Sequence, residues 1–156
     1  MDLGLKGKKV ILSGGSRGLG RAALELFADE GCDVAFFSRD AEQVAATKAS
    51  LEKRGGKVIG DSLDMAGGGY LDWLKKAADG LGGVDIFVHN VSSSGAGATG
   101  DWDVTFQYDV KGAVEGCQTL EPYLEKSGAG SVILMSSTAA FETFIQPQAF
   151  NALKAA

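Results

Sequence analysis

Residues 8–28 read KKVILSGGSRGLGRAALELFA, and this stretch decides the fold. Its first part, 8–12, is a short apolar run typical of a buried parallel strand. Its last part, 21–28, has apolar residues at helical spacing, which indicates an amphipathic helix. The Gly-rich turn between them allows a tight bend and the close approach of a phosphate, which the start of the helix attracts. Strand, turn and helix together predict the opening of a dinucleotide-binding unit, with a plain structural loop as the alternative for the turn alone.

The composition is that of one globular domain. The chain has 156 residues, 45% of them hydrophobic and 22% charged, which is enough for a single domain with a core. The formal net charge of −5 argues against nucleic acid or an anionic membrane as a partner. There is no apolar run of membrane-spanning length and no signal-peptide core at the N-terminus. Cys32 and Cys117 lack metal or redox spacing, so we expect buried free thiols, no metal site and a cytoplasmic location.

Strands and helices are expected to alternate along the whole chain. Further strands are predicted at 33–37, 57–63, 84–88 and 131–135. Helices are predicted at 41–54 and 70–78, as one long helix over 101–126, and from about Gln148 onward. This alternation predicts an α/β fold, a Rossmann-type doubly wound parallel sheet in the order 3-2-1-4-5 with helices on both faces. Residues 1–156 would form a single NAD(P)-binding domain.

The residues after the second predicted strand bear on the choice of cofactor. Open α/β sheets bind ligands at the carboxyl ends of their strands, and an acidic residue there often holds the ribose 2′-OH of NAD. Here the first polar residues are Ser38 and Arg39, which suit a 2′-phosphate, and Arg17 in the Gly-rich turn offers a second cation. A solvated turn residue is the alternative for each arginine. Asp40 is expected to point away.

The spacing Gly14-x-x-x-Gly18-x-Gly20 resembles the T-G-x-x-x-G-x-G motif of the short-chain dehydrogenase/reductase family, with Ser13 in place of Thr. The resemblance covers nearly the whole chain. It implies NADP(H) as the preferred cofactor, with NAD(H) as the alternative. The residues implied in cofactor binding are Gly14, Ser16, Arg17, Gly18, Leu19, Gly20, Ser38, Arg39, Asp64, Met65 and Asn90.

Three of the polar positions carry particular expectations. Asp64 stands where the family commonly touches adenine, although a cap for the following helix is an equal alternative. Asn90 matches the second Asn of the family's N-N-A-G segment, which bonds backbone and steadies the sheet beside the cofactor. His89 is the only histidine, and we favour a hydrogen-bonded structural role for it over that of a catalytic base.

The family's catalytic motif, S-x12-Y-x3-K, falls on Ser137, Phe150 and Lys154, so Phe150 stands at the position of the catalytic Tyr. The resemblance implies that Ser137 binds the substrate oxygen and that Lys154 tunes the phenol that Phe150 lacks. Asp109 stands where the family has an Asn in a proton relay, and an ionised carboxylate cannot donate a hydrogen bond. We therefore expect impaired catalysis, whether Phe150 is an engineered change or a natural one.

The resemblance implies an NADP(H)-dependent oxidoreductase that transfers hydride between nicotinamide and a small-molecule carbonyl or secondary alcohol. The alternative is a dinucleotide-binding sensor or scaffold without catalysis. We expect a homodimer or homotetramer through helix 101–126. The family domain continues beyond the position of Ala156, so we expect the chain to be part of a longer protein, with its fifth strand as an exposed edge. A self-sufficient five-stranded domain is the alternative.

Overall fold

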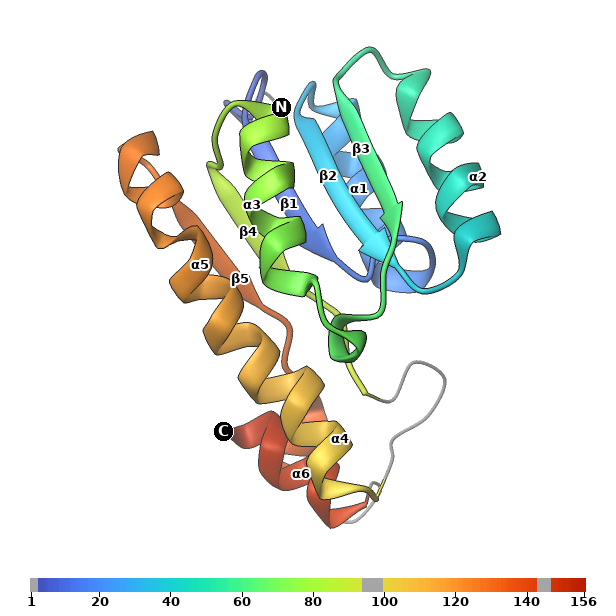
Figure 1. The fold of residues 1–156 in the computed structure, drawn as a ribbon, viewed down its shortest axis with the longest axis vertical. Coiled ribbons are helices and arrows are strands. Elements are labelled where there is room, and N and C mark those ends of the chain that lie inside the picture. Colours follow the sequence, from blue (N-terminus) through green and yellow to red (C-terminus); the bar gives the residue numbers. More distant parts are fainter. Residues whose placement is uncertain (1–2, 94–99, 143–146) are drawn as a thin grey trace.

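The five predicted strands form one parallel sheet. The computed structural model describes residues 3–93, 100–142 and 147–156. The strands lie in the order β3-β2-β1-β4-β5, which confirms the predicted fold class and strand order (Figure 1). Their bounds are β1 Lys9–Ser13, β2 Asp33–Ser38, β3 Val58–Ser62, β4 Ile86–His89 and β5 Ser131–Leu134.

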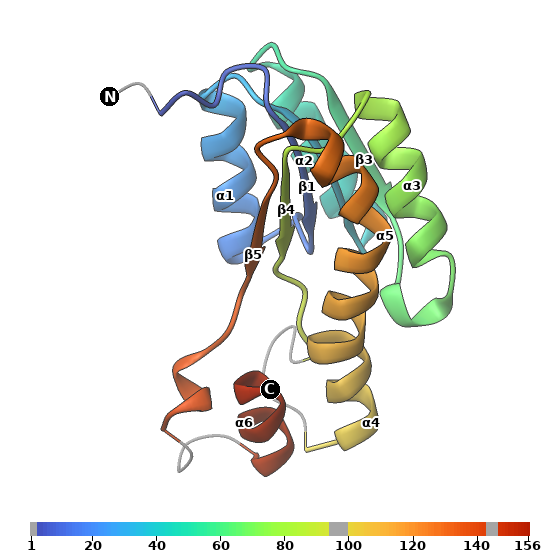
Figure 2. The same ribbon diagram turned by 90° about the vertical axis from the view of Figure 1, so that its left-hand side faces the viewer.

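The central strands are buried on both faces, which explains their continuous apolar runs. Val10 of β1 pairs with Val34 of β2 on one side and with Ile86 of β4 on the other. Helices cover both faces (Figure 2). One apolar cluster joins the sheet to α1 and α2, and a second joins it to α3 and α5. The helices are α1 Gly18–Asp29, α2 Ala41–Glu52, α3 Tyr70–Leu81, α4 Trp102–Thr105, α5 Gly112–Ser127 and α6 Gln148–Ala155.

The long helix predicted over 101–126 is interrupted in its middle. A π-helical segment, Phe106–Lys111, separates α4 from α5, so the prediction of one regular helix was wrong there. A side chain from the sheet explains the wider turn, because His89 Nε2 lies 2.9 Å from the Tyr108 carbonyl oxygen. The carbonyl can only accept, so Nε2 carries the proton. The segment contains Asp109, in keeping with the frequent occurrence of π-turns at functional sites.

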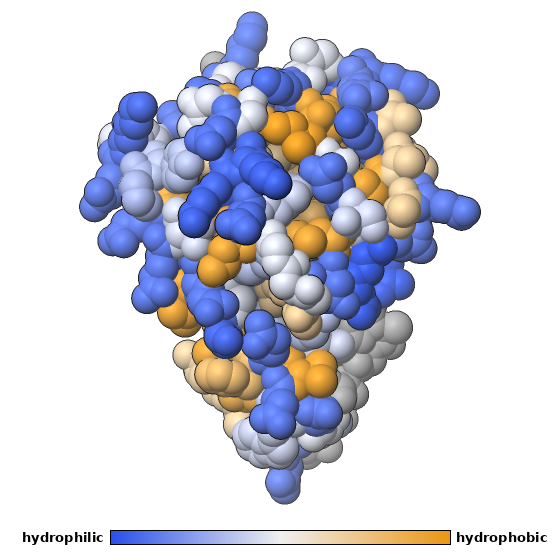
Figure 3. Space-filling view, in the orientation of Figure 1, coloured by the Kyte–Doolittle hydropathy of each residue, from blue (hydrophilic) through white to orange (hydrophobic). Residues whose placement is uncertain are grey.

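The fifth strand is an exposed edge, as expected. Val132 and Ile133 of β5 are 44% and 41% exposed, and β4 is the strand that pairs with it. Beyond β5 the chain forms a 3₁₀ turn, Thr138–Ala140, and then α6, which packs against α4 and the π-helical segment. Apolar patches interrupt the polar surface at the end of the molecule where these helices lie (Figure 3).

Two smaller expectations have mixed outcomes. Cys32 is a buried free thiol, whereas Cys117 is only partly buried on α5. None of the helices in the described ranges is long and apolar enough to span a bilayer.

Candidate functional site

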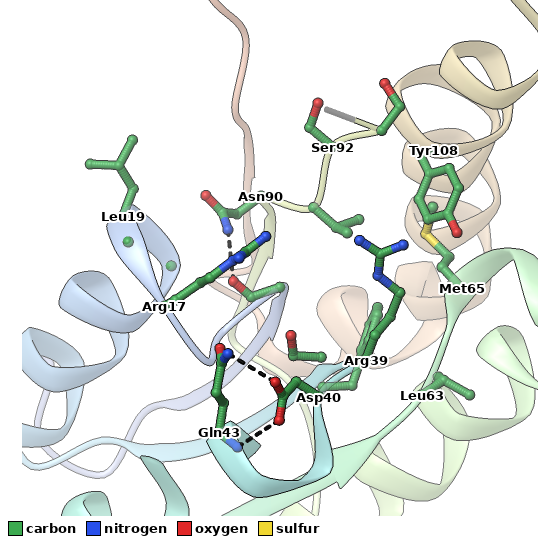
Figure 4. A pocket seen from close by; sticks show the side chains of 17 residues that line it. Arg17, Leu19, Arg39, Asp40, Gln43, Leu63, Met65, Asn90, Ser92 and Tyr108 are labelled. Carbon is green, nitrogen blue, oxygen red and sulfur yellow. Dashed lines mark hydrogen bonds between the residues drawn. The ribbon is translucent and has the colours of Figure 1, made fainter. Parts of the chain in front are cut away.

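A cavity of about 520 Å³ opens at the carboxyl edge of the sheet, between the Gly-rich turn, the end of β2 and the end of β4 (Figure 4). Most of the predicted cofactor residues line it, namely Gly14, Arg17, Gly18, Leu19, Gly20, Ser38, Arg39, Met65 and Asn90. Ser16 and Asp64 lie outside its lining, and so do the four predicted catalytic positions. Most of the predicted cofactor residues thus meet at one cavity, and the predicted catalytic positions lie outside its lining.

The Gly-rich turn needs its glycines. A Cβ on Gly20 would lie 2.1 Å from the backbone oxygen of Gly14, closer than any real contact. Gly18 has φ +55°, a left-handed conformation that favours glycine. Arg17 occupies the N-cap of α1, and among the described residues no side chain caps that helix. The turn thus brings bare backbone and the start of α1 to the cavity, which suits an anionic phosphate group.

Ser13 and Asn90 fasten the turn to β4. Ser13 Oγ accepts hydrogen bonds from the backbone N–H groups of Asn90 (3.0 Å) and Val91 (3.1 Å). In return, Asn90 Nδ2 donates to the backbone oxygen of Gly14 at 2.9 Å (Figure 4). Asn90 thus makes the kind of backbone contact that the resemblance implies. The importance of Ser13 was missed, because only the three-dimensional pairing of β1 with β4 brings its hydroxyl to these donors.

We predict that Asn90→Ala lowers the free energy of unfolding by about 1–2 kcal/mol, because it leaves the Gly14 carbonyl without its amide donor. Urea denaturation followed by circular dichroism measures this. Gln118→Ala removes an exposed amide on α5 and serves as the control, with an expected change within about 0.5 kcal/mol. Equal changes in the two variants would contradict the role assigned to Asn90.

Two arginines give the cavity positive charge. Arg17 and Arg39 point into it from opposite sides (Figure 4), and Ser38 also belongs to its lining. Ser16 Oγ donates to Ser38 Oγ at 2.8 Å, so Ser16 supports the lining from behind. Asp40 lines the cavity, which corrects the expectation that it points away. Its two carboxylate oxygens accept hydrogen bonds from the backbone and the side-chain amide of Gln43, because Asp40 caps α2.

Asp64 caps the short 3₁₀ turn Met65–Gly67, whereas the N-cap of the following helix, α3, is Gly69. The Asp64 carboxylate accepts from the backbone N–H of Ala66 at 3.1 Å and also from the hydroxyl of Tyr108. Burial and the bond to Asp64 raise the pKa of Tyr108, which lines the cavity beside Met65. Sequence reasoning missed Tyr108. The sequence offered one signal for it, an aromatic residue directly before Asp109. The direction of the Tyr108 side chain, however, depends on the π-helical turn.

Three of the four predicted catalytic positions, Lys154, Asp109 and Phe150, come together where α6 meets the π-helical segment. Lys154 Nζ lies 2.8 Å from Asp109 Oδ1, donates to the backbone oxygen of Met135 at 3.0 Å, and lies 5.8 Å from the centre of the Phe150 ring. Ser137 is turned to its own backbone, since its Oγ accepts from Ala139 N at 3.2 Å and caps the 3₁₀ turn. Lys154, Asp109 and Phe150 therefore form one cluster, whereas the Ser137 hydroxyl is engaged in its own cap.

Neighbouring groups favour the ionised form of Asp109, and burial favours the neutral form of His89 beside it. Burial alone would raise the pKa of Asp109, but hydrogen bonds from Lys154, Ser92 and Ser93 outweigh it and hold that pKa below its ordinary value. Burial lowers the pKa of His89, whose ring is held between the Tyr108 carbonyl and the Ser13 hydroxyl. His89 is therefore neutral at neutral pH and has the contacts of the favoured structural role.

A doubly wound parallel sheet with a Gly-rich turn at its carboxyl edge places the chain among the Rossmann-type proteins. Within that class, the chain belongs to the short chain dehydrogenase family, whose family model matches residues 8–156.

Relatives and solved structures agree with this membership. Isoepoxydon dehydrogenase patN of Penicillium expansum is 33% identical over 154 residues, which cover 96% of this chain and 60% of that protein. The 3-oxoacyl-[acyl-carrier-protein] reductase FabG of Chlamydia pneumoniae is 31% identical over 90% of this chain and 59% of its own length. The crystal structure of L-sorbose reductase from Gluconobacter frateurii, complexed with NADPH and L-sorbose, has a TM-score of 0.88 and 28% identity, covering 99% of this chain and 62% of that one. The chain thus spans about three fifths of the length of these proteins.

Proposed function

We propose that this chain is the cofactor-binding part of an NADP(H)-dependent oxidoreductase. Its reaction would be hydride transfer between nicotinamide and a small-molecule carbonyl or secondary alcohol. The observation that carries the proposal is the cavity at the carboxyl edge, where the bare Gly-rich turn and two arginines meet. Membership of the short chain dehydrogenase family and the NADPH complex of L-sorbose reductase support it.

The residues of the cavity fit this cofactor. The Gly14–Gly20 turn and the start of α1 suit the pyrophosphate, because Gly14, Gly18 and Gly20 carry no side chain and, among the described residues, no side chain caps α1. Arg39 and Ser38, with Arg17 across the cavity, would take the 2′-phosphate. Asp64 and Met65 would border the adenine. When bound, the cofactor supplies the hydride, and the protein has to position it and manage one proton.

The proposed reaction also needs a proton donor, which the family places at position 150. Ser137 would bind the substrate oxygen. It is the N-cap of the 3₁₀ turn that packs against α6, the helix that carries Lys154. At the position that should hold a phenol, Phe150 presents a ring without a hydroxyl, 7% exposed. General acid–base catalysis contributes roughly 10²–10⁴-fold, so we propose that the activity is reduced by a factor in this range. Cofactor binding should be retained, because none of the cavity contacts involves Phe150.

We predict that Arg39→Ala weakens NADPH binding roughly 10- to 100-fold, because a charge-assisted contact to the 2′-phosphate is lost. NADH lacks this phosphate, so its dissociation constant should change little. Titration of each reduced cofactor by its fluorescence measures both constants. Lys53→Ala, at an exposed cation just after α2, is the control and should change neither. Equal NADPH and NADH affinities that Arg39→Ala leaves unchanged would refute the preference for NADP(H).

A second candidate function is a dinucleotide sensor or scaffold without catalysis. It is favoured by two observations, the missing hydroxyl at Phe150 and the ion pair that Asp109 forms with Lys154. Both functions require the same cavity, so cofactor binding does not separate them. Turnover after Phe150→Tyr does.

We also propose a homodimer or homotetramer through residues 101–126. Trp102 of α4, Phe106 of the π-helical segment and Val114 of α5 are 53%, 47% and 50% exposed, so each of the three segments presents a large apolar side chain to solvent. Large exposed apolar groups of this kind mark interaction surfaces when they are contiguous. A monomeric mass in analytical ultracentrifugation would contradict the proposal.

A further inference from the structure

We propose that Asp109 is a positioning residue that keeps Lys154 neutralised in a buried ion pair, so that Lys154 activates a proton donor at position 150 only weakly. This inference rests on the proposed oxidoreductase function and deepens it. Catalysis would then be weakened twice, by the missing hydroxyl of Phe150 and by the charge of Asp109.

Lys154 and Asp109 form a close and buried ion pair. Lys154 Nζ and Asp109 Oδ1 are 2.8 Å apart, and their side chains are 8% and 0% exposed. The second carboxylate oxygen of Asp109 accepts from the backbone N–H of Ser93 at 3.1 Å. Solvent does not screen two charges held this way, in contrast to a surface ion pair.

Lys154 also has hydrogen-bond partners other than Asp109. Besides Asp109, its ammonium donates to the Met135 carbonyl at the end of β5. Its own backbone oxygen accepts from Ser136 Oγ at 2.8 Å. The pair thus ties three segments together, namely the π-helical turn, the end of β5 and α6. Lys154 is held as a structural tie, and its charge is balanced locally.

A group at position 150 would experience the charges of both Lys154 and Asp109. Lys154 Nζ lies 5.8 Å from the centre of the Phe150 ring, close enough to act on a phenol there. Asp109 places a negative charge 2.8 Å from that ammonium, so the two fields largely cancel at the ring. An Asn at position 109 would leave the lysine charge uncancelled, and its single amide oxygen could still accept at one of the two positions where the carboxylate accepts now.

The other charged groups near the pair do not change this balance. His89 of β4 faces both members, and its lowered pKa keeps it neutral at and above neutral pH. On the same long helix, Lys111 pairs with Glu115 at 3.8 Å, and Asp101 and Asp103 are exposed at its start. The described residues of β5, the 3₁₀ turn and α6 add no titratable side chain except Lys154.

The test compares the phenol introduced by Phe150→Tyr with and without Asp109→Asn. Ultraviolet difference titration of each variant against its matching Phe150 form isolates this phenol from Tyr70, Tyr108 and Tyr123. We expect the added Asp109→Asn change to lower the pKa of the phenol by about 1–3 units, the effect of an uncancelled cation at this range. The same pKa in both variants overturns the proposal.

Asp103→Asn in the Phe150→Tyr background is the matched control. It removes one exposed carboxylate from the same helix and should leave the phenol titration unchanged. A shift as large as that from Asp109→Asn would show a general charge effect and overturn the proposal.

A further variant keeps the test decisive if Asp109→Asn fails to fold. Asp109→Asn with Lys154→Met removes both charges together, and in the Phe150→Tyr background the phenol should titrate as it does beside the intact pair. A pKa that differs by a full unit overturns the proposal. NADPH binding, measured on the same proteins, reports separately on the proposed function, since the pair lies outside the cavity lining.

Discussion

Phe150→Tyr is expected to raise turnover about 10²-fold, the lower end of what general acid–base catalysis contributes. The substitution returns a hydroxyl to a ring that already lies beside Lys154 and next to the turn that carries Ser137. We expect the lower end because Asp109 still offsets the charge of Lys154. Adding Asp109→Asn should carry the rate toward the upper end. The measurement, on the full natural chain, is consumption of reduced nicotinamide with a panel of ketones and aldehydes, and formation of reduced nicotinamide from the oxidised cofactor with secondary alcohols.

The control for this prediction is Phe141→Tyr. Phe141 is 89% exposed at the end of the 3₁₀ turn, so the same change of side chain there adds a hydroxyl that faces solvent instead of Lys154. It should leave the rate unaltered. If Phe150→Tyr gives no turnover with any substrate of the panel while NADPH still binds, the sensor or scaffold function gains the support that the enzyme loses.

The architecture was predictable because it depends on patterns of residues that are neighbours in the sequence. Each central strand is an apolar run, and each is followed by a helix with an apolar face, so alternation and right-handed crossovers fix a parallel sheet. The Gly-rich turn was recognisable for the same reason. Gly20 has its role within a single strand–turn–helix unit, and its nearest neighbour, Gly14, lies in the same turn.

The π-helical segment was not predictable from local pattern. The sequence 101–126 has ordinary helical spacing, and the interruption depends on His89, a residue of β4 whose ring binds the Tyr108 carbonyl. The same long-range contact turns Tyr108 toward the cavity, where its hydroxyl meets Asp64. Propensity and spacing describe neighbours in the chain, so they do not report such a contact between a strand and a distant helix.

The catalytic cluster shows the same division. The spacing of Ser137, Phe150 and Lys154 predicted that they belong to one site, and the place of Asp109 in it was inferred from the resemblance. The pairing of Asp109 with Lys154 at 2.8 Å, and the full burial of its carboxylate, required the structure. An altered relay could be expected from the residue types, whereas a closed ion pair depends on how α6 packs against the π-helical segment.

Gly20→Ala is expected to lower the free energy of unfolding by about 3 kcal/mol and to abolish measurable NADPH binding. Helix propensity alone predicts the opposite sign, since Ala is favoured over Gly by up to about 1 kcal/mol within a helix. The new Cβ, however, would lie 2.1 Å from Gly14 O and 2.5 Å from Asn90 Nδ2. Both contacts belong to the bond that fastens the turn to β4, so the turn must open to admit the methyl group.

Gly80→Ala, within α3, is the matched control. There a Cβ would meet only the tip of the Ile59 side chain, which can move aside, so we expect a change within about 1 kcal/mol and unaltered NADPH binding. Chemical denaturation and cofactor fluorescence measure both variants. Stabilisation by Gly20→Ala, or its retention of tight NADPH binding, would show that the turn tolerates a side chain. Loss of binding in a Gly20→Ala protein that remains folded would show that the shape of the Gly-rich turn itself is needed to hold the cofactor.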